Sequence, residues 1–174
     1  MPLDTTSPQT SLCAAQVAVL ATPLGPVALY WCGDRGQGAL TRVVLAADGT
    51  RAPPPPHWLA DAFAGYFENP ARPISLPTRP GGTLFQRRVW QAIAAIAPGV
   101  TRTYGELAAE LGSSARAVGG ACRANPCPLV VPCHRIVARR GLGGFAGDRG
   151  GRLLDIKRWL LAHEGVHRQG GTRA

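Results

Sequence analysis

A cysteine and a histidine stand next to each other at Cys133 and His134, after the apolar run from Leu129 to Val131 and Pro132. A thiol with an ordinary pKa of about 8.5 is mostly protonated at neutral pH, and a neighbouring imidazole can take its proton. The pair therefore indicates a nucleophilic thiol. The alternative is that Cys133, like Cys127, only fills an apolar core.

By composition, the run from Leu129 to Val131 predicts a buried strand, and Pro132 ends it because proline has no N–H to donate. The thiol would then lie at a strand end. Adjacent side chains of a strand face opposite ways. A working Cys133–His134 pair therefore needs either a turn of the backbone between them or a bridging water.

Glu164 is the acid that could complete this pair. It extends the apolar face of the last helical pattern, and Gly165 follows as a stop signal. That face consists of Leu153, Ile156 and Leu160. A carboxylate in the last turn opposes the helix dipole and needs a cationic or hydrogen-bonding partner. We expect Glu164 to orient His134, which takes the Cys133 proton. The alternative is a frayed, solvent-exposed carboxylate.

Two short helical patterns, Tyr104 to Leu111 and about Ala115 to Ala124, are separated by Gly112 and form a helix-turn-helix pattern over about 103–124. One stripe of the second helix carries two cations on either side of two residues without side chains. Its members are Arg116, Gly119, Gly120 and Arg123. Close packing against another helix would explain the glycines, but the flanking charges favour a helix laid into a nucleic-acid groove.

The charge distribution also indicates a polyanionic partner. The chain has 174 residues and a formal net charge of +9. Residues 1–80 hold five arginines and five acids, whereas residues 81–174 hold fourteen basic and five acidic side chains. The whole excess therefore lies in the second part, which favours nucleic acid. A coding bias towards arginine is the alternative.

The pattern predicts a mixed α/β protein of the α+β kind. Residues 1–80 predict a small amino-terminal sheet followed by a helix, with a linker from Pro70 to Gly82, and residues 81–174 predict a mainly helical unit. We see no membrane span and no targeting segment. The five cysteines then favour free thiols in the cytoplasm. A zinc site at Cys122, Cys127 and Cys133 is disfavoured because the spacing matches no common zinc motif.

These motifs resemble those of the O6-alkylguanine-DNA alkyltransferases. The segment Pro132-Cys-His-Arg-Ile-Val137 is similar to the family's active-site motif, and the other matching segments occur in the family's order. They are Thr22-Pro-Leu-Gly25, Phe85-Gln86, Trp90, Thr103-Tyr104-Gly, Arg116-Ala-Val-Gly-Gly-Ala, Asn125-Pro, Gly144-Phe-Ala-Gly147 and Lys157-Arg-Trp-Leu-Leu-Ala-His-Glu164. The resemblance implies a winged helix-turn-helix-like catalytic domain. Its activity would be single-turnover repair of O6-alkylguanine, and of O4-alkylthymine, in double-stranded DNA, without a cofactor or metal and as a monomer.

The resemblance also implies roles for individual residues. Cys133 would accept the alkyl group with its sulfur ionised at the bottom of a cavity, His134 would act as base through a water, and Glu164 would orient His134. Asn125 would brace the turn that presents the cysteine. The recognition helix would dock in the minor groove, where Arg116 would replace the flipped nucleotide in the stack and Tyr104 would help rotate that nucleotide out and hydrogen-bond the base. The carbonyls of Cys133 and Ile136 would read the guanine amino group. The loop with Phe145, Ala146 and Gly147 would close the pocket.

Two departures and two rival functions stay open. Many relatives carry a hydroxyl residue where Ala146 stands, which would affect lesion range. Some bind zinc in the amino-terminal domain, where Cys13 and Cys32 lie without matching histidines. One rival is a nonenzymatic sensor of damaged bases, which the presence of Cys133 disfavours. The other is a Cys-His hydrolase, which would not need a basic helix-turn-helix.

Overall fold

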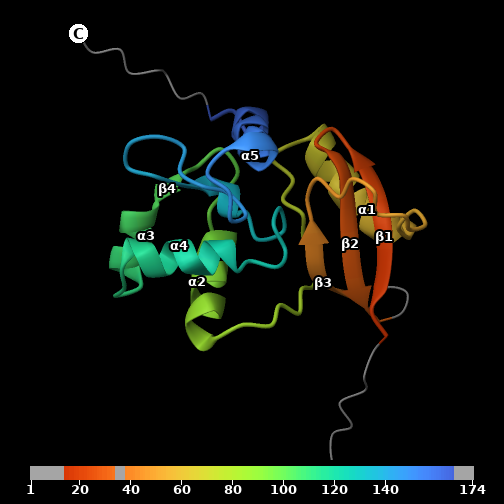
Figure 1. The fold of residues 1–174 in the computed structure, drawn as a ribbon, viewed down its shortest axis with the longest axis horizontal. Helices are drawn as coiled ribbons and strands as arrows, with labels where there is room; N and C mark the ends of the chain where they lie inside the picture. Colours follow the sequence, from red (N-terminus) through yellow and green to blue (C-terminus); the bar gives the residue numbers. More distant parts are fainter. Residues whose placement is uncertain (1–13, 34–37, 167–174) are drawn as a thin grey trace, which may run out of the picture.

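The computed structural model describes residues 14–33 and 38–166, which form a sheet-and-helix unit and a mainly helical unit (Figure 1). The first unit contains three antiparallel strands in the order β1-β2-β3, namely β1 (Gln16–Thr22), β2 (Gly25–Cys32) and β3 (Ala39–Val44). Helix α1 (His57–Glu68) lies against this sheet and buries Leu59 and Phe63 completely. Asn69 ends the helix directly before Pro70, where the sequence predicts the stop.

The second unit carries the expected short helices. Its elements are α2 (Leu84–Ala94), β4 (Arg102–Thr103), α3 (Tyr104–Glu110), α4 (Ala115–Arg123), the 3-10 helix η1 (Cys133–Arg135), β5 (Ile136–Val137) and α5 (Gly151–His163). Thr103 and Glu106 form a capping box at the start of α3, and Ser114 caps α4. Gly112 has a φ of 62° in the tight turn between these two helices, a conformation that glycine adopts at little cost. The mixed α+β class and the helix-turn-helix pattern are therefore confirmed.

Two long-range contacts place α3 and α4 around the active-site motif. The indole Nε1 of Trp90, on α2, donates to the carbonyl of Ala121 on α4 at 2.8 Å. The two-residue strands β4 and β5 pair in parallel, with Thr103 opposite Val137. Because Tyr104 follows β4 directly and η1 precedes β5, this register brings the start of α3 beside the motif.

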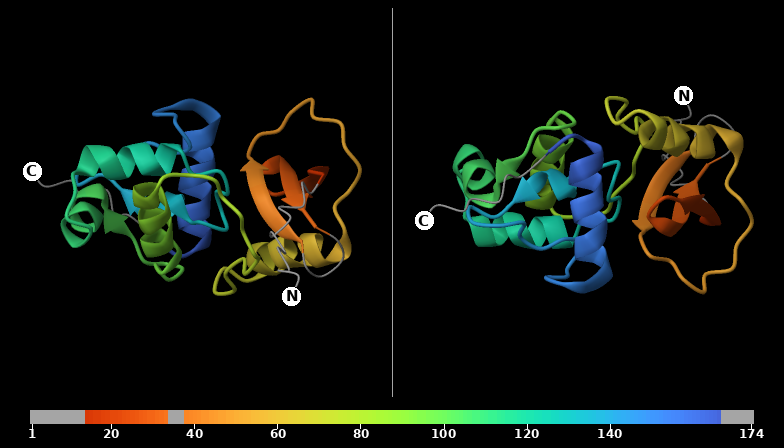
Figure 2. Two further views of the ribbon diagram at one scale, coloured as in Figure 1. Left: turned by 90° about the horizontal axis from the view of Figure 1, so that it is seen from below. Right: turned by 90° about the horizontal axis from the view of Figure 1, so that it is seen from above.

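The two units meet along α5, which lies on the side of the helical unit that faces the sheet (Figure 2). The backbone N–H of Val43 on β3 donates to the carbonyl of Pro126 at 2.8 Å. Asp48 and Arg152 form an ion pair across the same junction. In the expected linker, Pro77 accepts a hydrogen bond from the Leu40 backbone N–H at 2.8 Å, so part of this segment lies along the sheet.

The prediction of a buried strand from Leu129 to Val131 is wrong. This segment forms a turn in which the Val131 N–H donates to the Cys127 carbonyl at 2.9 Å and Leu129 has a φ of 77°. The run of apolar residues is flanked by prolines, which lack N–H donors for a strand ladder. The flanking prolines are Pro126, Pro128 and Pro132. Cys133 consequently begins a 3-10 helix instead of ending a strand.

Two further expectations concern cysteines and membranes. Cys122, Cys127 and Cys133 are free and buried, but Cys32 is disulfide-bonded, so the expectation that all five cysteines are free thiols is wrong. Cys13 lies outside the described residues. None of the helices within residues 14–33 and 38–166 has the length and hydropathy needed to cross a membrane.

The turn at Leu129 makes a testable prediction about backbone preference. We expect Leu129→Gly to be more stable than Leu129→Ala by about 1 kcal/mol, because both variants lose the same buried side chain but only glycine adopts a positive φ without strain. In a strand the order would be reversed, since alanine is then favoured over glycine. Urea unfolding of the two variants measures the difference, and a more stable Leu129→Ala would contradict the turn.

Candidate active site

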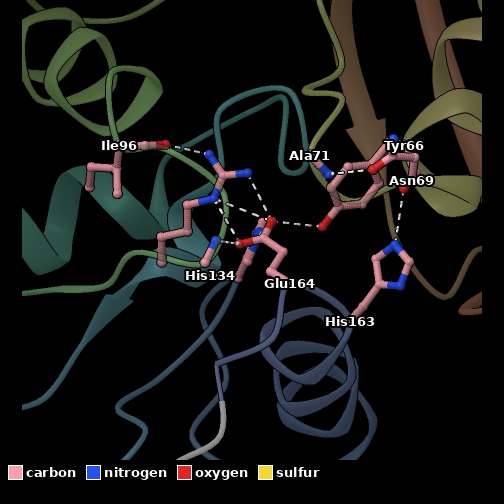
Figure 3. Close-up of polar contacts among 9 residues, drawn as sticks. Tyr66, Asn69, Ala71, Ile96, His134, His163 and Glu164 are labelled. Carbon is pink, nitrogen blue, oxygen red and sulfur yellow. Dashed lines mark hydrogen bonds and ion pairs between the residues drawn. The ribbon is translucent and has the colours of Figure 1, made fainter.

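Glu164 lies at the centre of a buried polar cluster directly after α5 (Figure 3). Its Oε1 contacts the His134 Nε2 at 2.9 Å, the Tyr66 hydroxyl at 2.9 Å and the Arg135 Nη2 at 2.8 Å. Its Oε2 accepts from the Arg135 Nε at 3.0 Å and from the Gly99 backbone N–H at 3.3 Å. The sequence-based expectation that Glu164 meets His134 agrees with this geometry, and the exposed-carboxylate alternative does not.

The charge on Glu164 is set by its partners. Burial alone would raise the pKa of the carboxyl, but the hydrogen bonds from His134 and Arg135 and the positive charge of Arg135 outweigh burial and hold that pKa below its usual range. The carboxylate is therefore ionised and can only accept hydrogen bonds. The side chain of Arg135 is itself buried and also donates to the Ile96 carbonyl at 2.5 Å.

His134 is fully buried, and the same argument fixes its protonation. Burial lowers the pKa of the imidazole more than Glu164 raises it, with Arg135 and Lys157 opposing a further positive charge. The ring is therefore neutral at neutral pH. Because the ionised Glu164 accepts from Nε2, the proton lies on Nε2 and leaves Nδ1 as an acceptor. Among the described residues, this Nδ1 is the one buried side-chain nitrogen or oxygen without a hydrogen-bond partner.

Cys133 begins η1 and is held by Asn125. The Asn125 Nδ2 donates to the Val131 carbonyl at 2.9 Å and lies 3.3 Å from the Cys133 Sγ, while its Oδ1 accepts from the Cys127 N–H at 3.0 Å. Burial raises the pKa of the Cys133 thiol, and the contacts with Asn125 and Lys157 oppose this only in part. Burial therefore favours the protonated thiol at rest, and an ionised sulfur during the reaction stays a prediction.

A cavity of about 940 Å³ opens onto Cys133. Most of the site residues predicted from the sequence line it, namely Tyr104, Arg116, Gly119, Gly120, Arg123, Cys133, Phe145, Ala146 and Gly147. Four predicted site residues are not among the lining residues, namely His134, Glu164, Asn125 and Ile136. The nucleophile and the basic stripe of α4 thus share one cavity.

The stripe on α4 faces this cavity and is open. A Cβ added to Gly119 or Gly120 would meet no described atom within 4 Å, so close packing inside the protein does not explain these glycines. Arg116 and Arg123 are exposed at either end of the stripe. The arrangement is a smooth, cationic surface at the cavity mouth.

The opposite wall is the loop from Leu142 to Asp148. The Tyr104 hydroxyl donates to the Gly144 carbonyl at 3.3 Å, and burial raises the pKa of this phenol, which keeps it a donor. Gly143 has a φ of 71°, and a Cβ there would lie 3.0 Å from the Tyr104 ring, which explains the glycine. Ala146 also has a positive φ, of 48°.

Sequence reasoning missed Lys157, Arg135 and Tyr66. Lys157 is fully buried, and its Nζ donates to the carbonyls of Ile136 at 2.6 Å and Gly144 at 2.9 Å. It ties the cavity loop to the active-site segment. A signal was available, because Lys157 lies on the apolar face of α5 where a charge is uncommon. No local pattern marks Tyr66, which reads as an ordinary core residue of α1.

Within residues 14–33 and 38–166, no three or more His, Cys, Asp or Glu side chains are grouped so that they could hold a metal ion. The disfavoured zinc site at Cys122, Cys127 and Cys133 thus finds no support.

Comparisons with known proteins point in the same direction as this geometry. The family described as "6-O-methylguanine DNA methyltransferase, DNA binding domain" matches residues 84–166. A methylated-DNA–protein-cysteine methyltransferase of Salmonella typhimurium is 50% identical over 114 residues, 63% of this chain and 64% of that protein. The chain therefore aligns with somewhat less than two thirds of that relative.

Two other relatives are matched over most of their length. The methylated-DNA–protein-cysteine methyltransferase of Methanosarcina acetivorans is 34% identical over 85% of this chain and 97% of its own. The crystal structure of Mycobacterium tuberculosis OGT in complex with DNA has a TM-score of 0.69 at 30% identity, covering 86% of this chain and 93% of that one. Fold and site thus define a protein of the DNA alkyltransferase class. The chain belongs to the methylated-DNA–protein-cysteine methyltransferase family.

The buried neutral His134 makes the stability of the fold depend on pH. Its folded-state pKa lies below the ordinary value of about 6.5, so acidification below that value protonates the unfolded chain first and removes stability. Between about pH 7.5 and about pH 5.5, His134 accounts for a loss of about 1 kcal/mol in the free energy of unfolding. Glu164 has the same sign in a lower window, below its ordinary pKa of about 4.3.

Urea unfolding at the two pH values tests this in wild type, His134→Gln and His57→Gln. The His134→Gln variant should lose less stability on acidification than wild type, because glutamine does not titrate. His57 is exposed at the start of α1, so His57→Gln is the matched control and should behave as wild type. Equal losses in all three proteins would refute the neutral buried imidazole.

Proposed function

We propose that this protein repairs DNA by transferring an alkyl group from the O6 atom of guanine to the Sγ of Cys133, once per molecule. One observation carries the proposal: the thiol and the smooth cationic stripe of α4 line the same cavity. A helix that faces DNA and a nucleophile in the same cavity can together bring a DNA base to the thiol. Membership of the family supports the same activity, and so do its relatives, which are named as methyltransferases of methylated DNA.

Proton removal from the thiol is the first chemical requirement. The thiol is protonated at rest, and the His134 Nδ1 is a buried acceptor without a protein partner. We infer that a water carries the Cys133 proton to this Nδ1. The imidazolium that forms is stabilised by the Glu164 carboxylate at 2.9 Å. The ammonium of Lys157 favours the negative sulfur, and the Asn125 amide contacts it.

The base has to leave the duplex before this chemistry can occur, because a buried thiol cannot reach an atom inside stacked DNA. We assign the DNA contact to α4, in the minor groove, where a stripe without side chains allows close approach. Arg116 at the cavity mouth is placed to occupy the space that the extruded nucleotide leaves. Sequence readout should be weak in the minor groove.

In the transfer step, the sulfur lone pair forms a bond to the alkyl carbon while the bond from that carbon to O6 breaks. The electron pair stays on the guanine. We assign to the Tyr104 hydroxyl, which would have to turn away from the Gly144 carbonyl, the hydrogen bond donated to the purine as negative charge develops. The thiol proton remains on His134 and then passes to solvent, and an equivalent proton from water neutralises the guanine anion. The thioether has no bond that water readily cleaves, so the reaction consumes the protein.

The expected reading of guanine by main-chain carbonyls needs one adjustment. The Ile136 carbonyl already accepts from Lys157 at 2.6 Å, and the Cys133 carbonyl accepts from the Ile136 N–H. Each carbonyl has a second lone pair, and that lone pair would have to take the guanine amino group. O4-alkylthymine is included in the proposal as a second substrate of the same chemistry.

Two further proposals concern the oligomeric state of the protein and its location in the cell. We propose a monomer, because the large hydrophobic side chains exposed in the described part of the chain are Leu84 and Val100 only, too few for a stable interface. Three free thiols are typical of the cytoplasm, whereas the Cys32 disulfide is not. A cytoplasmic location therefore stays a prediction.

Mass spectrometry after incubation with duplex DNA containing O6-methylguanine tests the proposed activity. We expect the protein to gain one methyl group at most, on Cys133, and the gain to disappear in Cys133→Ala. Cys127→Ala is the matched control, since Cys127 is also a free, buried thiol but does not line the cavity; it should still react.

The same assay separates the rival functions. A damaged-base sensor would bind the DNA without any mass change, and a hydrolase would turn over without a stable adduct. Arg116→Ala separates extrusion from thiol chemistry, because it should lose activity on duplex DNA and keep reactivity towards free O6-benzylguanine. A wild-type protein that gains no methyl group refutes the proposal.

A further inference from the structure

Tyr66 connects the amino-terminal unit to the proposed proton path. It lies in the last turn of α1, is 2% exposed, and donates its hydroxyl to the Glu164 Oε1 at 2.9 Å across 98 residues of sequence. Its ring meets the His163 ring edge-on with 5.4 Å between centroids. The His163 Nε2 also lies 3.0 Å from the Tyr66 carbonyl, so both the ring and the backbone of Tyr66 are fixed against the end of α5.

The hydroxyl contacts the carboxylate oxygen that also holds the base. His134 and Tyr66 both reach Oε1 at 2.9 Å, so the two donors share one acceptor atom (Figure 3). Burial and the neighbouring negative charge of Glu164 raise the pKa of the Tyr66 phenol, which therefore stays protonated and keeps donating. Any change in this hydrogen bond changes the position and the charge of the oxygen on which His134 depends.

A second contact from the amino-terminal unit supports the turn that holds Cys133. The Val43 N–H on β3 donates to the Pro126 carbonyl at 2.8 Å, one residue after Asn125, which holds the Cys133 Sγ. The amino-terminal unit thus contacts both supports of the reaction centre, the Asn125 turn and Glu164.

We propose that Tyr66 is a positioning residue through which the amino-terminal unit orients Glu164 and sets the basicity of His134. The inference rests on the proposed alkyl transfer. The titratable and charged groups that surround this point are Tyr66 from α1, Arg135 and His134 from η1, and Lys157, His163 and Glu164 from α5. Of these, only Tyr66 belongs to the amino-terminal unit.

The Tyr66→Phe variant isolates the hydroxyl, because phenylalanine keeps the ring contacts. Without the hydroxyl, Glu164 loses one of the donors that fix its orientation, so transfer should slow by about threefold to tenfold, the range of one hydrogen bond. More negative charge then remains on Oε1, which stabilises the imidazolium. The acid limb of the pH–rate profile should therefore move to higher pH by roughly half a unit or more.

Single-turnover transfer from free O6-benzylguanine to the full-length protein, followed by mass spectrometry across pH, measures both effects without DNA. Tyr30→Phe is the matched control, because it removes a hydroxyl from β2 of the same unit; it should keep the wild-type rate and profile. Thermal melting accompanies both variants. A role in structure alone would lower the melting temperature of Tyr66→Phe and leave the midpoint of its acid limb unchanged.

A double-mutant cycle with Glu164→Gln tests whether Tyr66 acts through Glu164. We expect Tyr66→Phe to add little to the loss caused by Glu164→Gln, because the acceptor is already altered. Fully additive losses would overturn the inference.

Hydroxyl-proton exchange in the wild-type protein is a test that needs no variant. In NMR, the Tyr66 hydroxyl proton should exchange with solvent more slowly than that of Tyr30. Equal exchange rates would also overturn the inference.

The wild-type reaction, run alongside, keeps this inference separate from the proposed function. Absence of a benzyl adduct on wild-type Cys133 overturns the alkyl transfer and this inference with it. A wild-type adduct combined with an unchanged rate and pH profile in Tyr66→Phe overturns the role of Tyr66 alone.

Discussion

The buried charge of Glu164 is the constraint on which the site depends. An ionised carboxylate removed from water is costly unless it is paired and fully hydrogen-bonded. Here Arg135 and His134 of η1, Tyr66 of α1 and the Gly99 N–H supply these partners from three separate segments. Since each segment has to be in place for the cluster to be satisfied, the fold and the protonation of His134 are fixed together.

The same cluster explains how the thiol can be unreactive at rest and still have a base available to take its proton. Burial keeps Cys133 protonated at rest, which protects it from adventitious reaction. The open glycines of α4 leave the cavity mouth free for a large polymer.

Local signals in the sequence were sufficient for the elements with regular periodicity. The amino-terminal sheet, α1, the helix-turn-helix and the pairing of Glu164 with His134 follow from β-rich runs, helical spacing, capping residues and a carboxylate on an apolar face. The strand predicted for Leu129 to Val131 is wrong because the flanking prolines lack the N–H donors of a strand ladder, and this outweighs the β-rich composition of the segment. The contact of Tyr66 with Glu164 could not be predicted, since the two residues are 98 positions apart and the local context of Tyr66 is that of a core aromatic.

The tautomer of His134 tests the account most directly, because the whole proton path depends on a bare Nδ1 and a protonated Nε2. Nitrogen NMR of the histidine ring in the unreacted protein at neutral pH reports both atoms. The account predicts one protonated nitrogen, Nε2, facing Glu164, and an unprotonated Nδ1. A doubly protonated ring, or a proton on Nδ1 alone, would contradict it.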